Sequence, residues 1–301
     1  MIRNLSPNSL GAAYMTLGSL AYVVNDGLVR VATDEGLDVY QALFLRGCAM
    51  VAIFVVIGRI RGEGVGRASL SRPLVVRVVA EVVATALFFG AIVHLRFANA
   101  QTILMLVPFV VTVVAARRGE QVTPRRYLLV AVGFAGVIAV VRPTPGGFSP
   151  WTLLVMAAAG ALVVREFATR RISSDVAPLP IALLTAIAIT TMMGAISLVT
   201  GWSAVTARSL VMVLLACAFL IAGYLFTIQT VRVGDLSVSA PFRYTTVVGA
   251  VVIGLVLFAE TPDPLTVVGC ALIVGAGVAG SRHEAPAPIT TEQRTDRTRR
   301  P

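Results

Sequence analysis

A series of long apolar runs constrains this chain more than any other feature. A helix needs about 17–25 apolar residues to cross a bilayer, and ten segments approach or meet that length: 10–30, 39–58, 74–95, 97–116, 126–142, 150–167, 179–199, 209–231, 236–259 and 265–281. Hydrophobic residues make up 57% of the chain and charged residues 13%, which excludes an ordinary soluble domain. The runs are continuously apolar, which favours helices over the alternating strands of a barrel. We predict an all-α integral membrane protein with ten transmembrane helices.

The positions of the arginines predict the orientation. A net charge of +10 would suggest nucleic acid in a soluble chain, but here most arginines lie in every second linker, at 59–77, 117–126 and 165–171. The other linkers hold only Arg30, Arg96, Arg142 and Arg208. The positive-inside rule then predicts that both termini are cytoplasmic. We expect a multi-pass protein of a bacterial inner membrane, with the lipid bilayer as a partner and no nucleic acid; the oligomeric state is left open.

An internal repeat relates the two halves. A shift of 140 residues, the separation of Glu120 and Glu260, also places Arg30 on Arg170. Five spans per unit is an odd number, so the second copy must enter the membrane from the opposite side. We predict a cytoplasmic N-terminus (1–9), a first five-helix repeat (10–144), a second, inverted five-helix repeat (145–281) and a disordered cytoplasmic tail (282–301).

Two short signatures carry a resemblance to a known family. GEQVTP at 119–124 and AETPDP at 259–264 each precede a glycine-rich helix, and APFRY occupies 240–244. With ten spans in two five-helix units, the chain resembles the drug/metabolite transporter superfamily, in its ten-helix EamA-type branch, over residues 10–281. The resemblance implies an inner-membrane carrier of small metabolites with a central cavity between the halves. It fixes neither the substrate nor the direction of transport.

Three ionisable residues lie near the middle of predicted spans: Arg46, Glu81 and Arg243. A charge at a helix centre costs about 2.5–3.5 kcal/mol on insertion scales, so each needs a counter-charge, water or a ligand. We expect the two arginines to bind a carboxylate or phosphate of the substrate, while Glu81 compensates their charge or carries a proton. Alternatively, Glu81 is the permanent partner of one arginine and joins two helices. Two cations and one anion favour an anionic or zwitterionic substrate.

Further polar residues of the spans could line the same midplane pocket. We add to the predicted substrate-binding set Tyr22, Asn25, Gln101, Tyr224, Ser239 and Tyr244. Prolines interrupt helical hydrogen bonding, and such breaks often lie at transport sites. The predicted helix-break and gate residues are Pro108, Pro241, Asp26 and Glu166. A tolerated kink or a solvated helix end is the alternative for each of these four.

The sequence lacks the motifs of several other function classes. The two histidines and three cysteines have no metal-ligand or triad spacing, and no P-loop is present. We therefore expect no cofactor, no metal and no enzymatic activity, but a secondary transporter using protons or an exchanged metabolite. The alternatives are a proton-coupled exporter of cationic drugs, which would need an acid at mid-depth in the first helix, and a lipid-modifying enzyme, which would need a paired acid–base set.

Overall fold

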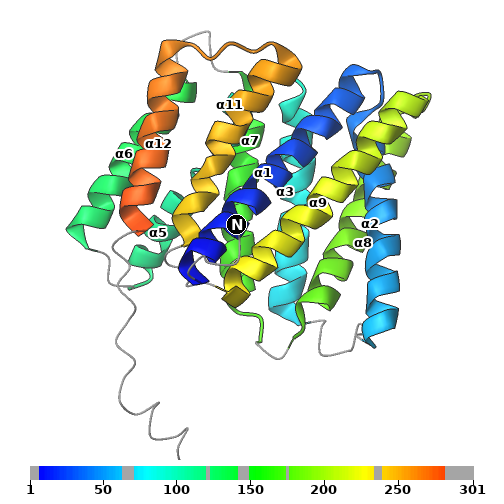
Figure 1. The fold of residues 1–301 in the computed structure, drawn as a ribbon, viewed down its shortest axis with the longest axis horizontal. Coiled ribbons are helices and arrows are strands. Elements are labelled where there is room, and N and C mark those ends of the chain that lie inside the picture. The colour runs from blue at the N-terminus through cyan, green and yellow to red at the C-terminus, as the bar shows by residue number, and fades with distance from the viewer. Residues whose placement is uncertain are drawn as a thin grey trace, which may run out of the picture.

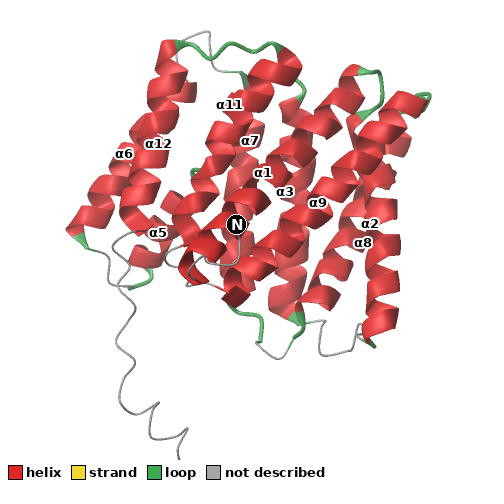
Figure 2. Ribbon diagram, viewed as in Figure 1, coloured by secondary structure: helices red, strands yellow, loops and turns green. Residues whose placement is uncertain are grey.

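The computed structural model describes residues 7–62, 71–119, 123–141, 149–173, 176–233 and 239–281, and within these ranges the chain forms helices and no strand (Figures 1 and 2). The first half contains α1 (Pro7–Asp34), α2 (Val39–Arg61), α3 (Arg72–Ile92), α4 (Phe97–Leu104), α5 (Val107–Arg117) and α6 (Pro124–Val141). The second half contains α7 (Pro150–Thr169), α8 (Pro178–Thr200), α9 (Ala207–Val233), the 3-10 helix η3 (Ala240–Tyr244), α11 (Thr245–Phe258) and α12 (Pro264–Ser281).

Six stretches are long and apolar enough to cross a membrane: α2, α3, the α4–α5 pair, α7, α8 and the segment 207–230 of α9. Apolar stretches of α6, of η3 with α11, and of α12 are shorter. The prediction of a helical membrane protein is thereby confirmed. The count of ten crossings and the inverted repeat stay predictions.

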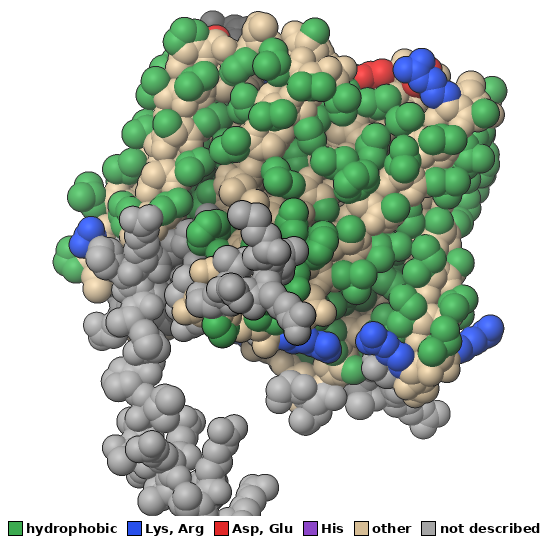
Figure 3. Space-filling view, viewed as in Figure 1, with side chains coloured by type: hydrophobic (Ala, Val, Ile, Leu, Met, Phe, Trp, Pro, Cys, Tyr) green, Lys and Arg blue, Asp and Glu red, His purple; other side chains and the backbone are tan. Residues whose placement is uncertain are grey.

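The surface has the character expected next to lipid. Large hydrophobic side chains are exposed along the helices, for example Leu198 (74%) and Val256 (72%), and they cover most of the visible face in Figure 3. Basic side chains gather at the lower edge of that view. We call the end of the bundle with the 35–38 turn and the 259–263 linker the upper end, and the opposite end, where α2 and α9 finish, the lower end (Figure 1).

Four helix pairs account for most of the packing: α1 with α9, α3 with α7, α6 with α12, and α2 with α8. Glycines allow the closest approaches, as is usual where membrane helices pack. A Cβ on Gly136 of α6 would lie 2.7 Å from the carbonyl oxygen of Gly269 on α12, and a Cβ on Gly269 would lie 2.6 Å from that of Gly136. Helices from the two halves of the sequence are therefore interleaved throughout the bundle.

Two predicted spans are discontinuous. The span predicted at 97–116 is divided into α4 and α5, and Pro108 lies in the first turn of α5. The span predicted at 236–259 consists, within its described part, of η3, with Pro241 in its first turn, followed by the 14-residue helix α11. Proline supplies no N–H to a helix and is accommodated at such first turns. The shorter α11 places Arg243 before the helix and toward the lower end, not near the middle of a continuous span.

Candidate functional site

Helix α1 carries polar side chains at three successive levels. Tyr22, Asn25 with Asp26, and Arg30 follow one another at intervals of three to four residues, so they lie along one side of the helix. Each level meets different helices. We call the residues around Tyr22 the lower cluster (Tyr22, Arg77, Glu81, Arg165, Glu166 and Thr185) and those around Asn25 the upper cluster (Asn25, Asp26, Arg46 and Gln101).

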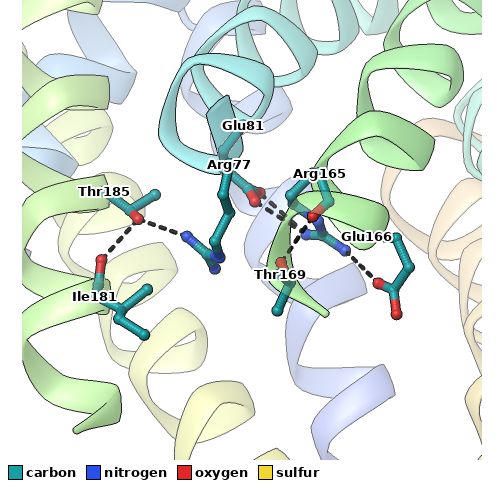
Figure 4. A network of polar contacts seen from close by, with 7 residues as sticks. All are labelled: Arg77, Glu81, Arg165, Glu166, Thr169, Ile181 and Thr185. Carbon is teal, nitrogen blue, oxygen red and sulfur yellow. Dashed lines mark hydrogen bonds and ion pairs between the residues drawn. The ribbon is translucent and has the colours of Figure 1, made fainter. Parts of the chain in front are cut away.

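An ion pair between α3 and α7 is the centre of the lower cluster (Figure 4). Arg165 Nη1 donates to both carboxylate oxygens of Glu81, at 3.0 and 3.3 Å. Its Nη2 lies 3.9 Å from a carboxylate oxygen of Glu166. The side chains of Glu81 and Arg165 are 20% and 30% exposed, so the pair is shielded but still accessible.

Arg77 lies beside this pair and has a neutral partner. Its Nη1 donates to Thr185 Oγ1 at 2.7 Å, and the Thr185 hydroxyl donates to the carbonyl of Ile181 at 2.7 Å (Figure 4). Among the described residues, no ion pair joins Arg77 to a carboxylate; Glu81, one turn further along α3, pairs with Arg165. The half-buried Arg77 guanidinium therefore lacks a direct anionic partner within this part of the chain.

Tyr22, Tyr224 and Arg243 connect other helices with the lower cluster. The Tyr22 hydroxyl lies within electrostatic range of Arg165, Glu81 and Arg243. Tyr224 of α9 lies within electrostatic range of Tyr22 and of the nearby Arg77. Side chains of α1, α3, α7, α8 and α9, from both halves of the chain, thus lie near one another.

The upper cluster is a chain of hydrogen bonds in which the arginine and the two amides are buried and Asp26 is partly exposed. Arg46 Nη1 donates to Asn25 Oδ1 at 2.9 Å, and Asn25 Nδ2 donates to Asp26 Oδ1 at 2.7 Å. Gln101 Nε2 donates to the other Asp26 oxygen at 2.7 Å. Arg46, Asn25 and Gln101 are 6%, 2% and 3% exposed. A cation and an anion are therefore joined through amide groups, which satisfies the polar atoms that burial would otherwise penalise.

The three charges expected to share one midplane pocket lie apart in the structure. Arg46 belongs to the upper cluster, Glu81 belongs to the lower one, and Arg243 is exposed. Glu81 does pair with an arginine, but the partner is Arg165, which the sequence analysis counted among the arginines of the linkers. Arg77 and Glu81 are four residues apart on α3, so they lie on the same face of that helix. This spacing could have indicated that Arg77 belongs to the same charged site as Glu81.

The other predicted residues lie around these clusters. Asp26, expected near a membrane surface, is bonded within the upper cluster, and Tyr224 donates to the carbonyl of Pro178 at 3.3 Å. Tyr244 is buried, with its ring 6.3 Å from that of Phe109, and Ser239 is buried. Within the described ranges, no group of three or more potential metal ligands is found.

Comparison with known proteins identifies the class. A model of the EamA-like transporter family matches residues 149–280. The second half of the chain is thus similar to an EamA-like transporter domain. Two relatives, both named pseudopaline exporter CntI, come from Pseudomonas aeruginosa strains UCBPP-PA14 and PAO1 and are 25% identical over 283 and 282 residues. Each alignment covers 90% of this chain and 96% of the relative, so the likeness extends beyond the matched domain.

A solved crystal structure has a similar fold. It superposes with a TM-score of 0.63 at 20% sequence identity, over 90% of this chain and 97% of the other. Together the comparisons are consistent with membership of the drug/metabolite transporter superfamily and point to a transporter of small molecules in a membrane, not to an enzyme.

Proposed function

We propose that this EamA-like protein is a secondary transporter that moves a small anionic or zwitterionic metabolite across the cytoplasmic membrane, with the lower cluster as its substrate site. The observation that carries the proposal is the half-buried Arg77, bonded to a neutral hydroxyl while Glu81 is occupied by Arg165. A substrate carboxylate or phosphate would supply the charge-assisted hydrogen bonds that Arg77 lacks. The two arginines and two glutamates of the lower cluster balance in charge, but both glutamates lie beside Arg165 while Arg77 faces a neutral hydroxyl, which disfavours the cationic-drug exporter that the sequence left open.

The packing supports two inverted repeats. The 140-residue offset makes α7 the counterpart of α1 and α9 the counterpart of α3. A repeat related to the first by symmetry therefore requires that an α1–α9 contact be matched by an α7–α3 contact, and both contacts are present. The α2–α8 and α6–α12 contacts are each exchanged for themselves. The helix interruptions after Leu104 and after Tyr244 also differ by 140 residues, which is the offset of the sequence repeat. Ten crossings follow if α1, α6, α12 and the η3–α11 pair also span the membrane.

Alternating access is the mechanism that such an arrangement serves. The two repeats would rock around the lower cluster, as in other transporters built from inverted repeats. We assign the lower end to the cytoplasm because the arginine-rich linkers lie there. The names of the relatives favour export as the direction. A proton or an exchanged metabolite would supply the driving force.

Ligand binding by detergent-purified protein tests the proposal. We expect small carboxylates and phosphates to raise the melting temperature, organic cations to have no effect, and Arg77→Gln to abolish the shift. Arg72→Gln is the matched control, since Arg72 is an exposed arginine at the start of the same helix. Stabilisation that survives Arg77→Gln unchanged would remove Arg77 from the site. Stabilisation by cations alone would refute the anionic substrate class.

A further inference from the structure

A second charged site lies at the upper end of the bundle. Arg30 Nη1, at the third polar level of α1, is 2.9 Å from Glu260 Oε1, and both side chains are 13% exposed. The other Glu260 oxygen accepts a hydrogen bond from the backbone N–H of Phe97 at 2.7 Å. This N–H belongs to the first residue of α4, where the helix dipole also favours a negative charge.

The Glu260 carboxylate joins the two halves of the chain. It comes from the second half, whereas Arg30 and Phe97 come from α1 and α4 of the first. Arg30 has a further contact within its own half, because Nη1 also donates to the carbonyl of Leu95 at 2.9 Å. Its guanidinium lies 4.3 Å from the centre of the Phe258 ring, which belongs to the second half. Glu260 and Phe258 are thus the groups that would leave if the halves moved apart here.

Several features suit this contact to reversible opening. Glu260 lies in the linker after α11, next to Ala259, whose φ of 51° turns the backbone away from the helix. Among the described residues, Arg30 Nε is buried without a hydrogen-bond partner, so the closed contact is not fully satisfied. A neighbouring pair, Arg96 with Asp263 at 3.6 Å, has a more exposed arginine, at 55%, and should contribute less because water screens it.

We propose that Arg30 and Glu260 form a latch that holds the upper end closed and must separate before the substrate site can open toward that end. The inference rests on the proposed transport function. On opening, Glu260 would lose its contacts with both Arg30 of α1 and the N–H of Phe97 at the start of α4. Arg30 would stay in place, because its hydrogen bond to the carbonyl of Leu95 lies within the first half. In the structure this contact between Arg30 and Glu260 is formed, so the latch is in its closed state.

A native cysteine can report on this opening. Cys270 of α12 is buried, and its Sγ lies 3.7 Å from Thr102 Oγ1 on α4, the helix whose first residue contacts Glu260. In a Cys48→Ser/Cys217→Ala background, the rate at which a maleimide labels Cys270 in detergent measures access to this region. We expect Glu260→Gln to raise the rate about tenfold or more, because loss of a charge-assisted pair shifts a two-state equilibrium by at least that factor.

Two further variants make the test decisive. Glu35→Gln breaks an exposed ion pair with Arg208 at the same end and should leave labelling unchanged. Arg30→Lys keeps the charge but loses the planar guanidinium, so an intermediate rate is expected. Wild-type labelling rates in a folded Glu260→Gln protein would overturn the latch, and so would failure of both Glu260→Gln and Arg30→Lys to fold, because the pair would then be structural. Labelling needs no substrate, so it tests the latch without testing transport. An absence of flux in proteoliposomes would count against the proposed transport function and not against the latch.

Discussion

The two clusters on α1 contain the same kinds of side chain but differ in burial. In the upper cluster, Arg46 is 6% exposed and reaches Asp26 only through the amide of Asn25. In the lower cluster, Arg165 bonds directly to Glu81 and their side chains are 20–30% exposed. The upper cluster thus satisfies its own polar groups, whereas the lower one leaves a guanidinium, that of Arg77, with a neutral partner.

This difference suggests how one helix can hold a structural site and a binding site one turn apart. A buried charge whose partner is removed is strongly destabilising, so the upper cluster should be intolerant of change and should fix α1 against α2 and α4. A partly exposed cluster can exchange partners with water or a ligand at lower cost. The following predictions separate the two roles, by stability for the upper cluster and by ligand binding for the lower one.

Replacement of Arg46 by methionine should have the largest effect on stability. It leaves the partly exposed Asp26 carboxylate without a nearby cation. Losing one partner of a fully buried pair costs about 3–5 kcal/mol, so we expect a loss of stability toward the lower end of that range. Thermal unfolding in detergent measures the loss. The double variant Arg46→Met/Asp26→Asn should recover part of it, since the unpaired charge is then gone. If Arg46→Met melts no lower than Glu81→Gln, the upper cluster is not the structural one.

Replacement of Glu81 by glutamine should cost less stability but more transport. The pair with Arg165 is partly exposed, so we expect about 1–2 kcal/mol. If Glu81 carries the coupling proton, flux in proteoliposomes loses its response to a pH gradient. Flux that still follows the gradient would show that Glu81 is only a fixed counter-ion of Arg165.

Replacement of Thr185 by valine tests how Arg77 is positioned. The change removes the hydroxyl that accepts from Arg77 and keeps the charge. A net hydrogen bond of about 0.5–1.5 kcal/mol corresponds to a loss of about three- to tenfold in affinity for the anion identified by the thermal-shift panel. Isothermal titration measures it. Thr200→Val, at the exposed end of the same helix, should bind like the wild type.

Replacement of Arg243 by glutamine should have the smallest effect. The residue is exposed, so stability should change by less than about 0.5 kcal/mol. Its charge reaches the lower cluster through space, and anion affinity should fall about twofold at low salt and less at high salt, where charges are screened. A loss as large as that of Arg77→Gln would instead place Arg243 in direct contact with the substrate, as the sequence suggested.

Sequence alone determined the class of molecule and much of its architecture. Whether a segment lies in lipid or in water decides its composition, so apolar runs and arginine-rich linkers can be recognised without a structure. The signatures around Glu120 and Glu260 are local motifs and can be recognised in the same way. The membrane-protein class and the family resemblance follow from them. The same logic identified the charges Arg46 and Glu81 as exceptional, because a charge within an apolar run is visible without knowledge of its neighbours.

Only the tertiary structure decided which charges meet. Arg165 lies 84 residues from Glu81 in sequence, and Arg30 is brought to Glu260 only when α1, α4 and the linker after α11 assemble. Arg77, Arg165 and Arg30 looked like linker arginines because hydropathy does not show which direction a side chain takes. Which charged side chains form a pair depends on how helices from the two halves pack. That packing is determined by side chains throughout the bundle, so it cannot be read from any single segment.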